Sequence, residues 1–158
     1  MAIQSVLMIC MGNICRSPTA EAVFREYAKN AGLEVSVDSA GTIGMHKGSS
    51  PDPRSMAAAH NRGYTFNGIY SRKVVEQDFF DFDLILAMDN ANYQNLLELC
   101  PKQELQNKIK MFLQHSKQED FIEVPDPYYG GAKGFELVLN LLEDGCEGWI
   151  NFIISENS

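Results

Sequence analysis

The sequence contains no apolar run that approaches the roughly 18 residues a membrane-spanning helix needs. It also lacks a basic cluster, because its 13 lysine and arginine residues are scattered and 21 acidic residues leave a formal charge of -8 at pH 7. A surface of that sign repels the phosphates of nucleic acids and of anionic lipids. We therefore expect neither nucleic acid nor a membrane among the partners. Any phosphate chemistry has to use a short, concentrated site, and the sequence gives no indication of the oligomeric state.

Cysteine is scarce and irregularly spaced. Its four occurrences, Cys10, Cys15, Cys100 and Cys146, include no Cys-x2-Cys zinc pair and do not follow the spacing of a small secreted disulfide scaffold. A chain of 158 residues buries enough core to fold without disulfides. The first residues also lack the basic segment and small-residue cleavage site of a signal peptide. The simplest expectation is a cytoplasmic protein, in which Cys10 and Cys15 need an explanation of their own.

Short apolar segments alternate with stretches of helical periodicity. The predicted strands cover residues 6–9, 34–38, 83–88 and 109–113. The predicted helices run from a Ser17 cap to Gly32, from Asp52 to Gly63, from an Asp89 cap to Cys100, and over 138–153. Continuous apolar strands that alternate with helices are typical of a parallel sheet buried on both faces. We predict one α/β domain over residues 1–158, a parallel four-stranded sheet with helices on both faces and a phosphate loop after the first strand.

Ligands of such sheets bind at the carboxyl ends of the strands, near helix N-termini. Segments 10–17, 39–52 and 89–92 fall there in the predicted arrangement. The segment 114–130 is a further polar loop, of a length that is common in functional loops. Catalytic and binding residues are expected in these segments.

The first of these segments has the composition of a phosphate cradle. It places Cys10 and Arg16 six positions apart, between a strand and a helix. Backbone N–H groups in such a loop turn inward and meet the positive end of the helix dipole. The planar fork of Arg16 can bind two phosphate oxygens at once, which a lysine cannot do. The same positive groups should stabilise a thiolate at Cys10.

The segment Cys10–Pro18, CMGNICRSP, resembles the signature of the low-molecular-weight protein tyrosine phosphatases. The resemblance continues in the family's order, over nearly the whole chain, at Asp38–Thr42, Pro51–Arg54, Asp81–Asp83, Ala87–Asp89 and Asp126–Gly130. It implies an enzyme that hydrolyses phosphotyrosine in protein substrates. In the family this reaction passes through a cysteinyl-phosphate intermediate and uses no cofactor and no metal.

The catalytic roles that the resemblance implies fall on residues whose chemistry suits them. Cys10 is the nucleophile, Arg16 clamps the phosphate, and Asp126 is the general acid. A thiolate that attacks phosphorus expels a poor leaving group unless a proton reaches that group, and the ionised carboxylate can afterwards activate water. No metal is required, because Arg16 and the backbone amides carry the positive charge.

The resemblance also implies supporting roles within the loop. The residues that bind phosphate or support the loop are Met11, Gly12, Asn13, Ile14, Cys15 and Ser17. Asn13 holds the loop conformation, and Ser17 hydrogen-bonds the thiolate. Cys15 has a second implied role, because a neighbouring thiol can capture oxidised Cys10 as a disulfide before irreversible oxidation. Packing of the loop against the sheet is the alternative role of Cys15.

Residues outside the loop are implied to line the substrate cleft. Tyr128 and Tyr129 resemble the family's paired tyrosines, which flank the cleft and can be phosphorylated. Met45 falls where relatives usually carry Trp or Tyr, and methionine keeps an apolar wall with weaker ring stacking. Asp89 is interpreted as a helix cap, as a partner in the cleft, or as both.

One supporting residue of the family is missing. Many relatives carry a histidine that holds the loop asparagine, from the segment before the third strand. Residues 61–114 contain no histidine, so Asn13 must be held differently. His46 and His60 are interpreted as surface or loop residues.

Other activities on related folds stay open. An arsenate reductase needs two further cysteines near the site to transfer electrons by disulfide exchange. None lies between residues 16 and 99, and Cys100 and Cys146 fall on apolar helix faces. An arginine phosphatase would carry a threonine at the position of Ile14, whose apolar side chain favours a flat aryl substrate. A phosphocysteine carrier leaves Arg16 unexplained.

Overall fold

The computed structural model describes residues 2–127 and 130–158. It contains a four-stranded sheet in the order β2-β1-β3-β4, in which each neighbouring pair is parallel. The strands are β1 (Ser5–Cys10), β2 (Ser36–Gly41), β3 (Leu84–Ala87) and β4 (Ile109–Met111). The predicted α/β fold with a parallel four-stranded sheet is confirmed.

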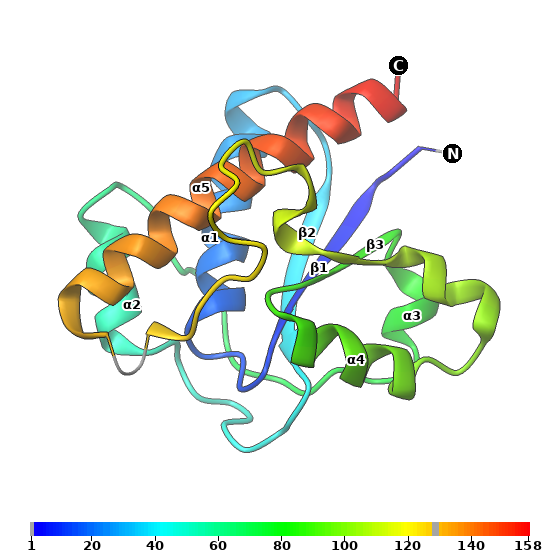
Figure 1. Ribbon diagram of the computed structural model, residues 1–158, viewed down its shortest axis with the longest axis horizontal. Helices are drawn as coiled ribbons and strands as arrows, with labels where there is room; N and C mark the ends of the chain where they lie inside the picture. The colour runs from blue at the N-terminus through cyan, green and yellow to red at the C-terminus, as the bar shows by residue number, and fades with distance from the viewer. Residues whose placement is uncertain (1, 128–129) are drawn as a thin grey trace.

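Helices cover both faces of this sheet. One side carries α1 (Arg16–Asn30), α2 (Pro53–His60) and α5 (Gly131–Glu156), and the other carries α3 (Asp78–Asp81) and α4 (Asn90–Leu99) (Figure 1). Val6 and Met8 of β1 belong to the cluster under α1 and α5. Leu7 and Ile9 face the opposite way and pack with residues of α3 and α4. Because β1 is buried on both faces, its sequence is continuously apolar rather than alternating.

All four strands differ from their predicted bounds, β1 and β3 by one residue at each end and β2 and β4 by more. β2 extends to Gly41 rather than covering 34–38, because it pairs along its length with β1 from Ser5 to Cys10. β4 ends at Met111, and the next residues form a short 3-10 helix, η2 (Phe112–His115), that packs against α5. The apolar side chains of this segment are buried in the 3-10 helix as they would be in a strand, so apolar character alone could not separate the two.

Two short helical segments carry no periodicity that predicts them. α3 is a helix of four residues, and η1 (Gln103–Lys108) is a 3-10 helix without a buried residue. The last helix, α5, also begins earlier than its predicted range of 138–153, at Gly131.

The prediction that Ser17 caps the first helix is wrong. α1 begins at Arg16, and Cys15 occupies the N-cap position without a side-chain hydrogen bond. Pro18 lies within the first turn, where a missing N–H costs nothing because those groups have no partner inside the helix. Ser17 is fully buried, and its hydroxyl faces Cys10 instead of the end of the helix.

The carboxyl ends of three neighbouring strands meet in the lower part of Figure 1. β1 leads into the loop 11–15, β2 into the loop 42–52, and β3 toward Asp89 at the start of α4. The segment before α5 joins them, because the backbone N–H of Val124 donates to the carbonyl of Met88 at 2.8 Å. Four segments that are distant in the sequence thus surround the end of β1.

Across residues 2–127 and 130–158, no helix is both long and apolar enough to cross a membrane.

Candidate active site

The loop after β1 turns sharply at Asn13. Its φ of 56° is the only positive value at a non-glycine position among the described residues. Asn13 is buried, and both ends of its amide are used: Nδ2 donates to Ser17 Oγ at 2.8 Å, and Oδ1 accepts from the backbone N–H of Arg72 at 3.0 Å. Contacts from two elements therefore hold a left-handed conformation that is costly for an ordinary residue.

Cys10 ends β1 with its sulfur beside Ser17. The distance between Sγ and Oγ is 3.0 Å, and both residues are buried. Asn13 already donates to this hydroxyl oxygen, which leaves the Ser17 proton for an acceptor. The alternative acceptor, the carbonyl of Ala40, is farther away at 3.5 Å. The arrangement can thus provide a hydrogen bond to a thiolate at Cys10.

Arg16 is a buried cation that is fixed in orientation. Its Nη1 donates to Asp89 Oδ2 at 2.6 Å and to the carbonyl of Val124 at 3.0 Å. Burial lowers the pKa of the guanidinium, but Cys10 and then Asp89 raise this pKa by more, so that the net shift is upward. Asp89 also accepts from the backbone N–H of Asn92 at 2.8 Å. It therefore caps α4 and holds Arg16 at the same time.

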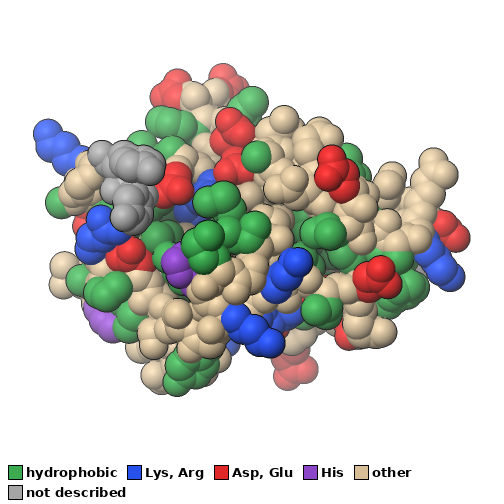
Figure 2. Space-filling model, turned by 90° about the horizontal axis from the view of Figure 1, so that it is seen from below, with side chains coloured by type: hydrophobic (Ala, Val, Ile, Leu, Met, Phe, Trp, Pro, Cys, Tyr) green, Lys and Arg blue, Asp and Glu red, His purple; other side chains and the backbone are tan. Residues whose placement is uncertain are grey.

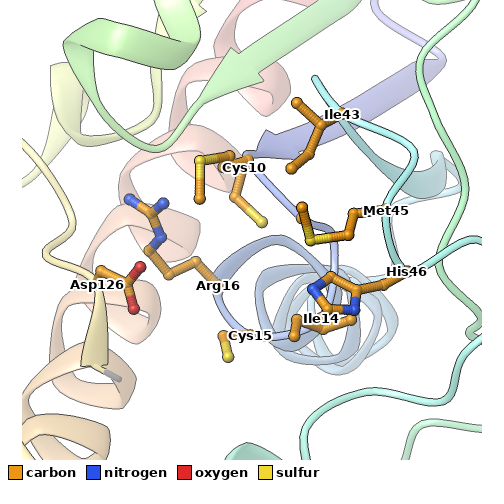
Figure 3. A pocket seen from close by; sticks show the side chains of 10 residues that line it. Cys10, Ile14, Cys15, Arg16, Ile43, Met45, His46 and Asp126 are labelled. Atoms are coloured by element: carbon orange, nitrogen blue, oxygen red, sulfur yellow. The ribbon is translucent and has the colours of Figure 1, made fainter. Parts of the chain in front are cut away.

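A cavity of about 370 Å³ opens over this loop. Its lining consists of Cys10, Met11, Gly12, Ile14, Cys15, Arg16, Ile43, Met45, His46 and Asp126. Figure 3 shows Arg16 and Asp126 on one side of Cys10, and Met45 on the other. Figure 2, which looks onto this end of the molecule, shows hydrophobic side chains gathered beside a histidine near the centre. The cavity thus has one charged wall and one apolar wall.

The apolar wall includes two exposed methionines. Met45 is 77% exposed and Met11 is 49% exposed, so both thioethers are accessible to a ligand. The structure places Met45 in the cavity wall, where the resemblance implies it.

His46 lies in a loop, as interpreted from the sequence, and it also lines the cavity. A Cβ atom at Gly12 would lie 3.1 Å from His46 Cδ2, so the absence of a side chain at Gly12 leaves room for the ring. His60 lies outside the site, at the end of α2, where its ring meets the edge of Phe66.

The backbone of Arg72 holds Asn13, in place of the histidine side chain that the resemblance implies for many relatives. Its N–H holds Asn13, and the neighbouring Ser71 Oγ donates to the carbonyl of Gly12 at 3.0 Å. The contact between the Arg72 N–H and Asn13 could not be predicted from residue types, since every residue except proline carries a backbone N–H.

Cys15 lines the cavity but differs from Cys10 in its surroundings. Burial raises the pKa of the Cys15 thiol to about 12, against the opposing effect of a hydrogen bond with Ser55. At neutral pH this thiol therefore keeps its proton. Cys100 and Cys146 do not line the cavity: Cys146 is buried in α5, and Cys100 ends α4 and is only partly buried.

Tyr128 and Tyr129, the predicted pair of tyrosines beside the cleft, lie outside the described residues. Within the described ranges, no three His, Cys, Asp or Glu side chains are grouped so that they could hold a metal ion.

A parallel α/β sheet whose first strand ends in a cysteine, with a buried arginine at the start of the following helix, has the residue types of a phosphate-binding loop beside a thiol. The chain belongs to the low molecular weight phosphotyrosine protein phosphatase family, whose sequence pattern matches residues 5–158. Membership places it among the protein-tyrosine-phosphatases, which are phosphoric monoester hydrolases. The resemblance stated from the sequence is thereby confirmed.

Relatives match over nearly their whole length. The low molecular weight protein-tyrosine-phosphatase YfkJ of Bacillus subtilis is 43% identical, over 90% of this chain and 91% of that protein. The human low molecular weight phosphotyrosine protein phosphatase is 35% identical, over 94% and 95%. A crystal structure of the protein tyrosine phosphatase of Entamoeba histolytica, with Hepes in its active site, superposes with a TM-score of 0.92 at 44% identity and covers 98% of this chain and 99% of that one.

Gly41, the last residue of β2, is expected to be essential for the position of the loop. A Cβ atom there would lie 2.6 Å from the carbonyl oxygen of Met11 and 3.1 Å from the backbone nitrogen of Asn13. Because the obstacle is backbone, Gly41→Ala should displace the loop and weaken vanadate binding about 10-fold or more. Gly44→Ala is the matched control, since its Cβ would make ordinary contacts at 3.6 Å with the Lys73 side chain. Equal vanadate affinity in the two variants would contradict this expectation.

Proposed function

We propose that the chain hydrolyses phosphotyrosine through a cysteinyl-phosphate intermediate, with Asp126 as general acid and then general base. The observation that carries the proposal is the meeting of Cys10, Arg16 and Asp126 around one cavity, with Ser17 Oγ 3.0 Å from the Cys10 sulfur. Family membership supports the overall reaction, and the contacts within the cavity support its division into two steps.

Binding of the phosphate uses the positive groups of the loop. Arg16 and the backbone N–H groups at the start of α1 would surround the phosphate oxygens and hold phosphorus over the Cys10 sulfur. The contacts of Arg16 with Asp89 and Val124 fix its guanidinium before substrate arrives, which reduces the ordering required on binding.

In the first step, the Cys10 thiolate attacks phosphorus and the bond to the tyrosine oxygen breaks. Asp126, an exposed residue on the segment before α5, delivers a proton to the departing phenoxide. In the second step, the ionised Asp126 takes a proton from a water molecule as that water attacks the cysteinyl phosphate. Inorganic phosphate and the free Cys10 thiolate result, and no metal takes part in either step.

The apolar wall favours an aryl group on the phosphate. Met11, Ile14 and Met45 line the cavity with apolar side chains that can pack against a ring. Phosphoproteins that carry phosphotyrosine are accordingly the proposed partners. The apolar Ile14 disfavours an arginine phosphatase. The absence of Cys100 and Cys146 from the cavity disfavours an arsenate reductase.

Removal of the nucleophile or the clamp should have different consequences. Cys10→Ser is expected to abolish turnover of a phosphotyrosine peptide while phosphate or vanadate binding stays measurable. Arg16→Lys should lower kcat by about 100-fold or more, since a point charge cannot replace a planar two-pronged donor.

Steady-state kinetics without added metal, and with phosphoarginine assayed in parallel, test both expectations. Faster turnover of phosphoarginine than of the aryl phosphate, or full loss of activity with a chelator, would contradict the proposal.

The role of Asp126 depends on the leaving group. Asp126→Asn should lower kcat by about 100-fold or more for phenyl phosphate and by less for substrates whose leaving group needs no proton. An equal loss of kcat for good and poor leaving groups would mean that a different group is the acid.

Cys15 is proposed to protect Cys10 against irreversible oxidation. Peroxide converts the Cys10 thiolate to a sulfenic acid, and attack by the Cys15 sulfur then forms a disulfide and releases water. Figure 3 shows the Cys15 side chain pointing away from Cys10, so closure of the disulfide requires a change in the loop.

Wild-type enzyme inactivated by peroxide should therefore recover with a thiol reductant, whereas Cys15→Ser should not. Mass spectrometry of the variant should find sulfinic or sulfonic acid at Cys10. Because burial raises the pKa of Cys15 to about 12, disulfide formation should become faster as the pH rises from neutral. Complete recovery of Cys15→Ser would leave Cys15 with a packing role alone.

A further inference from the structure

A chain of hydrogen bonds connects the Cys10 sulfur to a segment far along the sequence. Ser17 Oγ lies 3.0 Å from the sulfur, and Asn13 Nδ2 donates to that oxygen at 2.8 Å. Asn13 Oδ1 in turn accepts from the backbone N–H of Arg72 at 3.0 Å. The position of the Arg72 backbone therefore orients the Asn13 amide and, through it, the hydroxyl beside the nucleophile.

The segment 71–74 is attached to three parts of the site. It pairs with the end of β2, because the N–H of Gly41 donates to the carbonyl of Arg72 and the N–H of Val74 donates to the carbonyl of Gly41, each at 2.8 Å. Ser71 Oγ bonds the carbonyl of Gly12 in the phosphate loop. The backbone N–H of Ser71 donates to Ser49 at 2.8 Å, in the loop that contributes Met45 to the cavity. A shift of this segment would therefore reach the phosphate loop and the loop that contributes Met45.

Two carboxylates hold the Arg72 side chain. Asp78 accepts a two-pronged pair from Nη1 and Nη2 at 2.9 and 3.1 Å, and Asp38 accepts from Nη2 and Nε at 3.1 and 3.2 Å. The Asp78 side chain is 8% exposed, against 47% for Asp38, so solvent screens the Asp78 pair less. Asp78 also accepts from the backbone N–H of Val75 at 2.9 Å. The short helix α3 thus presents one buried charge to the segment that supports the phosphate loop.

We infer that Asp78, with a smaller contribution from Asp38, is a positioning residue for catalysis. It holds Arg72 so that the segment 71–74 keeps the Asn13 amide aligned with Ser17 and Cys10. Asp78 does not line the cavity, so its effect must pass through this segment. The inference rests on the proposed function of Cys10 and extends it to a residue on the opposite face of the sheet from α1.

The test is the substitution Asp78→Asn, which keeps the size of the side chain and an acceptor for Val75 but removes the charge beside Arg72. The value of kcat/KM for an aryl phosphate should fall about 10-fold or more, because a small misplacement of a reacting group is costly. The midpoint of the pH dependence of Cys10 alkylation by iodoacetate should also move to higher pH, since the hydrogen bond to the thiolate is misaligned. Asp38→Asn should move both quantities in the same direction by less, and Asp78→Glu should restore part of the loss.

Glu143→Gln is the matched control for loss of an ion pair. Glu143 bonds Arg62 at 2.8 Å and Tyr64 at 2.6 Å, in contacts that do not involve the cavity. This variant should lower Tm without moving the alkylation midpoint. If Asp78→Asn behaves in the same way, Asp78 is merely structural and the inference is overturned.

Misfolding of Asp78→Asn and failure of the proposed function can each be distinguished from failure of the inference. If Asp78→Asn fails to fold, Asp38→Asn decides: a shifted midpoint supports the inference, and an unshifted one overturns it. Alkylation does not require turnover, so a wild-type enzyme that hydrolyses no aryl phosphate would contradict the proposed function while the midpoint still tests the positioning role.

Discussion

The proposed function makes one electrostatic demand on the structure: a nucleophilic sulfur and a phosphate have to be held together in a chain of formal charge -8. The acidic surface opposes any anion at long range, so the favourable interactions have to act at short range. They are concentrated in the turn between β1 and α1, where the Ser17 hydroxyl, the start of the helix and the buried Arg16 converge on Cys10. Asp89 balances the charge of Arg16 and fixes its direction, at 2.6 Å.

The fold meets this requirement by placing β1 between β2 and β3 in a parallel sheet. Both neighbouring strands end beside the turn, so one contributes the close backbone approach at Gly41 and the other contributes Asp89. The segment 71–74 pairs with the end of β2, and its Arg72 N–H hydrogen-bonds the side chain of the strained Asn13. Each neighbour of the turn thus contributes a contact that the turn could not make by itself, and the left-handed backbone of Asn13 persists because these contacts outweigh its cost.

Features that depend on side-chain type were predictable from the sequence, and features that depend on backbone contacts were not. Three features follow from local side-chain preferences and are found in the structure. β1 is a continuous apolar strand, Asp89 caps α4, and Cys10 and Arg16 line one cavity. Ser17 was misassigned as a helix cap because the same hydroxyl suits a cap or a buried sulfur, and only the tertiary contact decides between them. The hydrogen bond from the Arg72 backbone N–H to Asn13 could not be predicted from the sequence. The position of the His46 ring depends on the space that Gly12 leaves because it has no side chain.

In the proposed mechanism, Cys10 carries the phosphoryl group between the two steps. The most direct measurement is to mix the enzyme with a phosphotyrosine peptide labelled on phosphorus, denature it within the first turnover and locate the label by mass spectrometry. The proposed mechanism predicts a burst of free tyrosine peptide equal to the amount of enzyme, with the label covalently attached to the Cys10 sulfur. Turnover at the normal rate with no labelled protein at any time, or with the label on another residue, would contradict it.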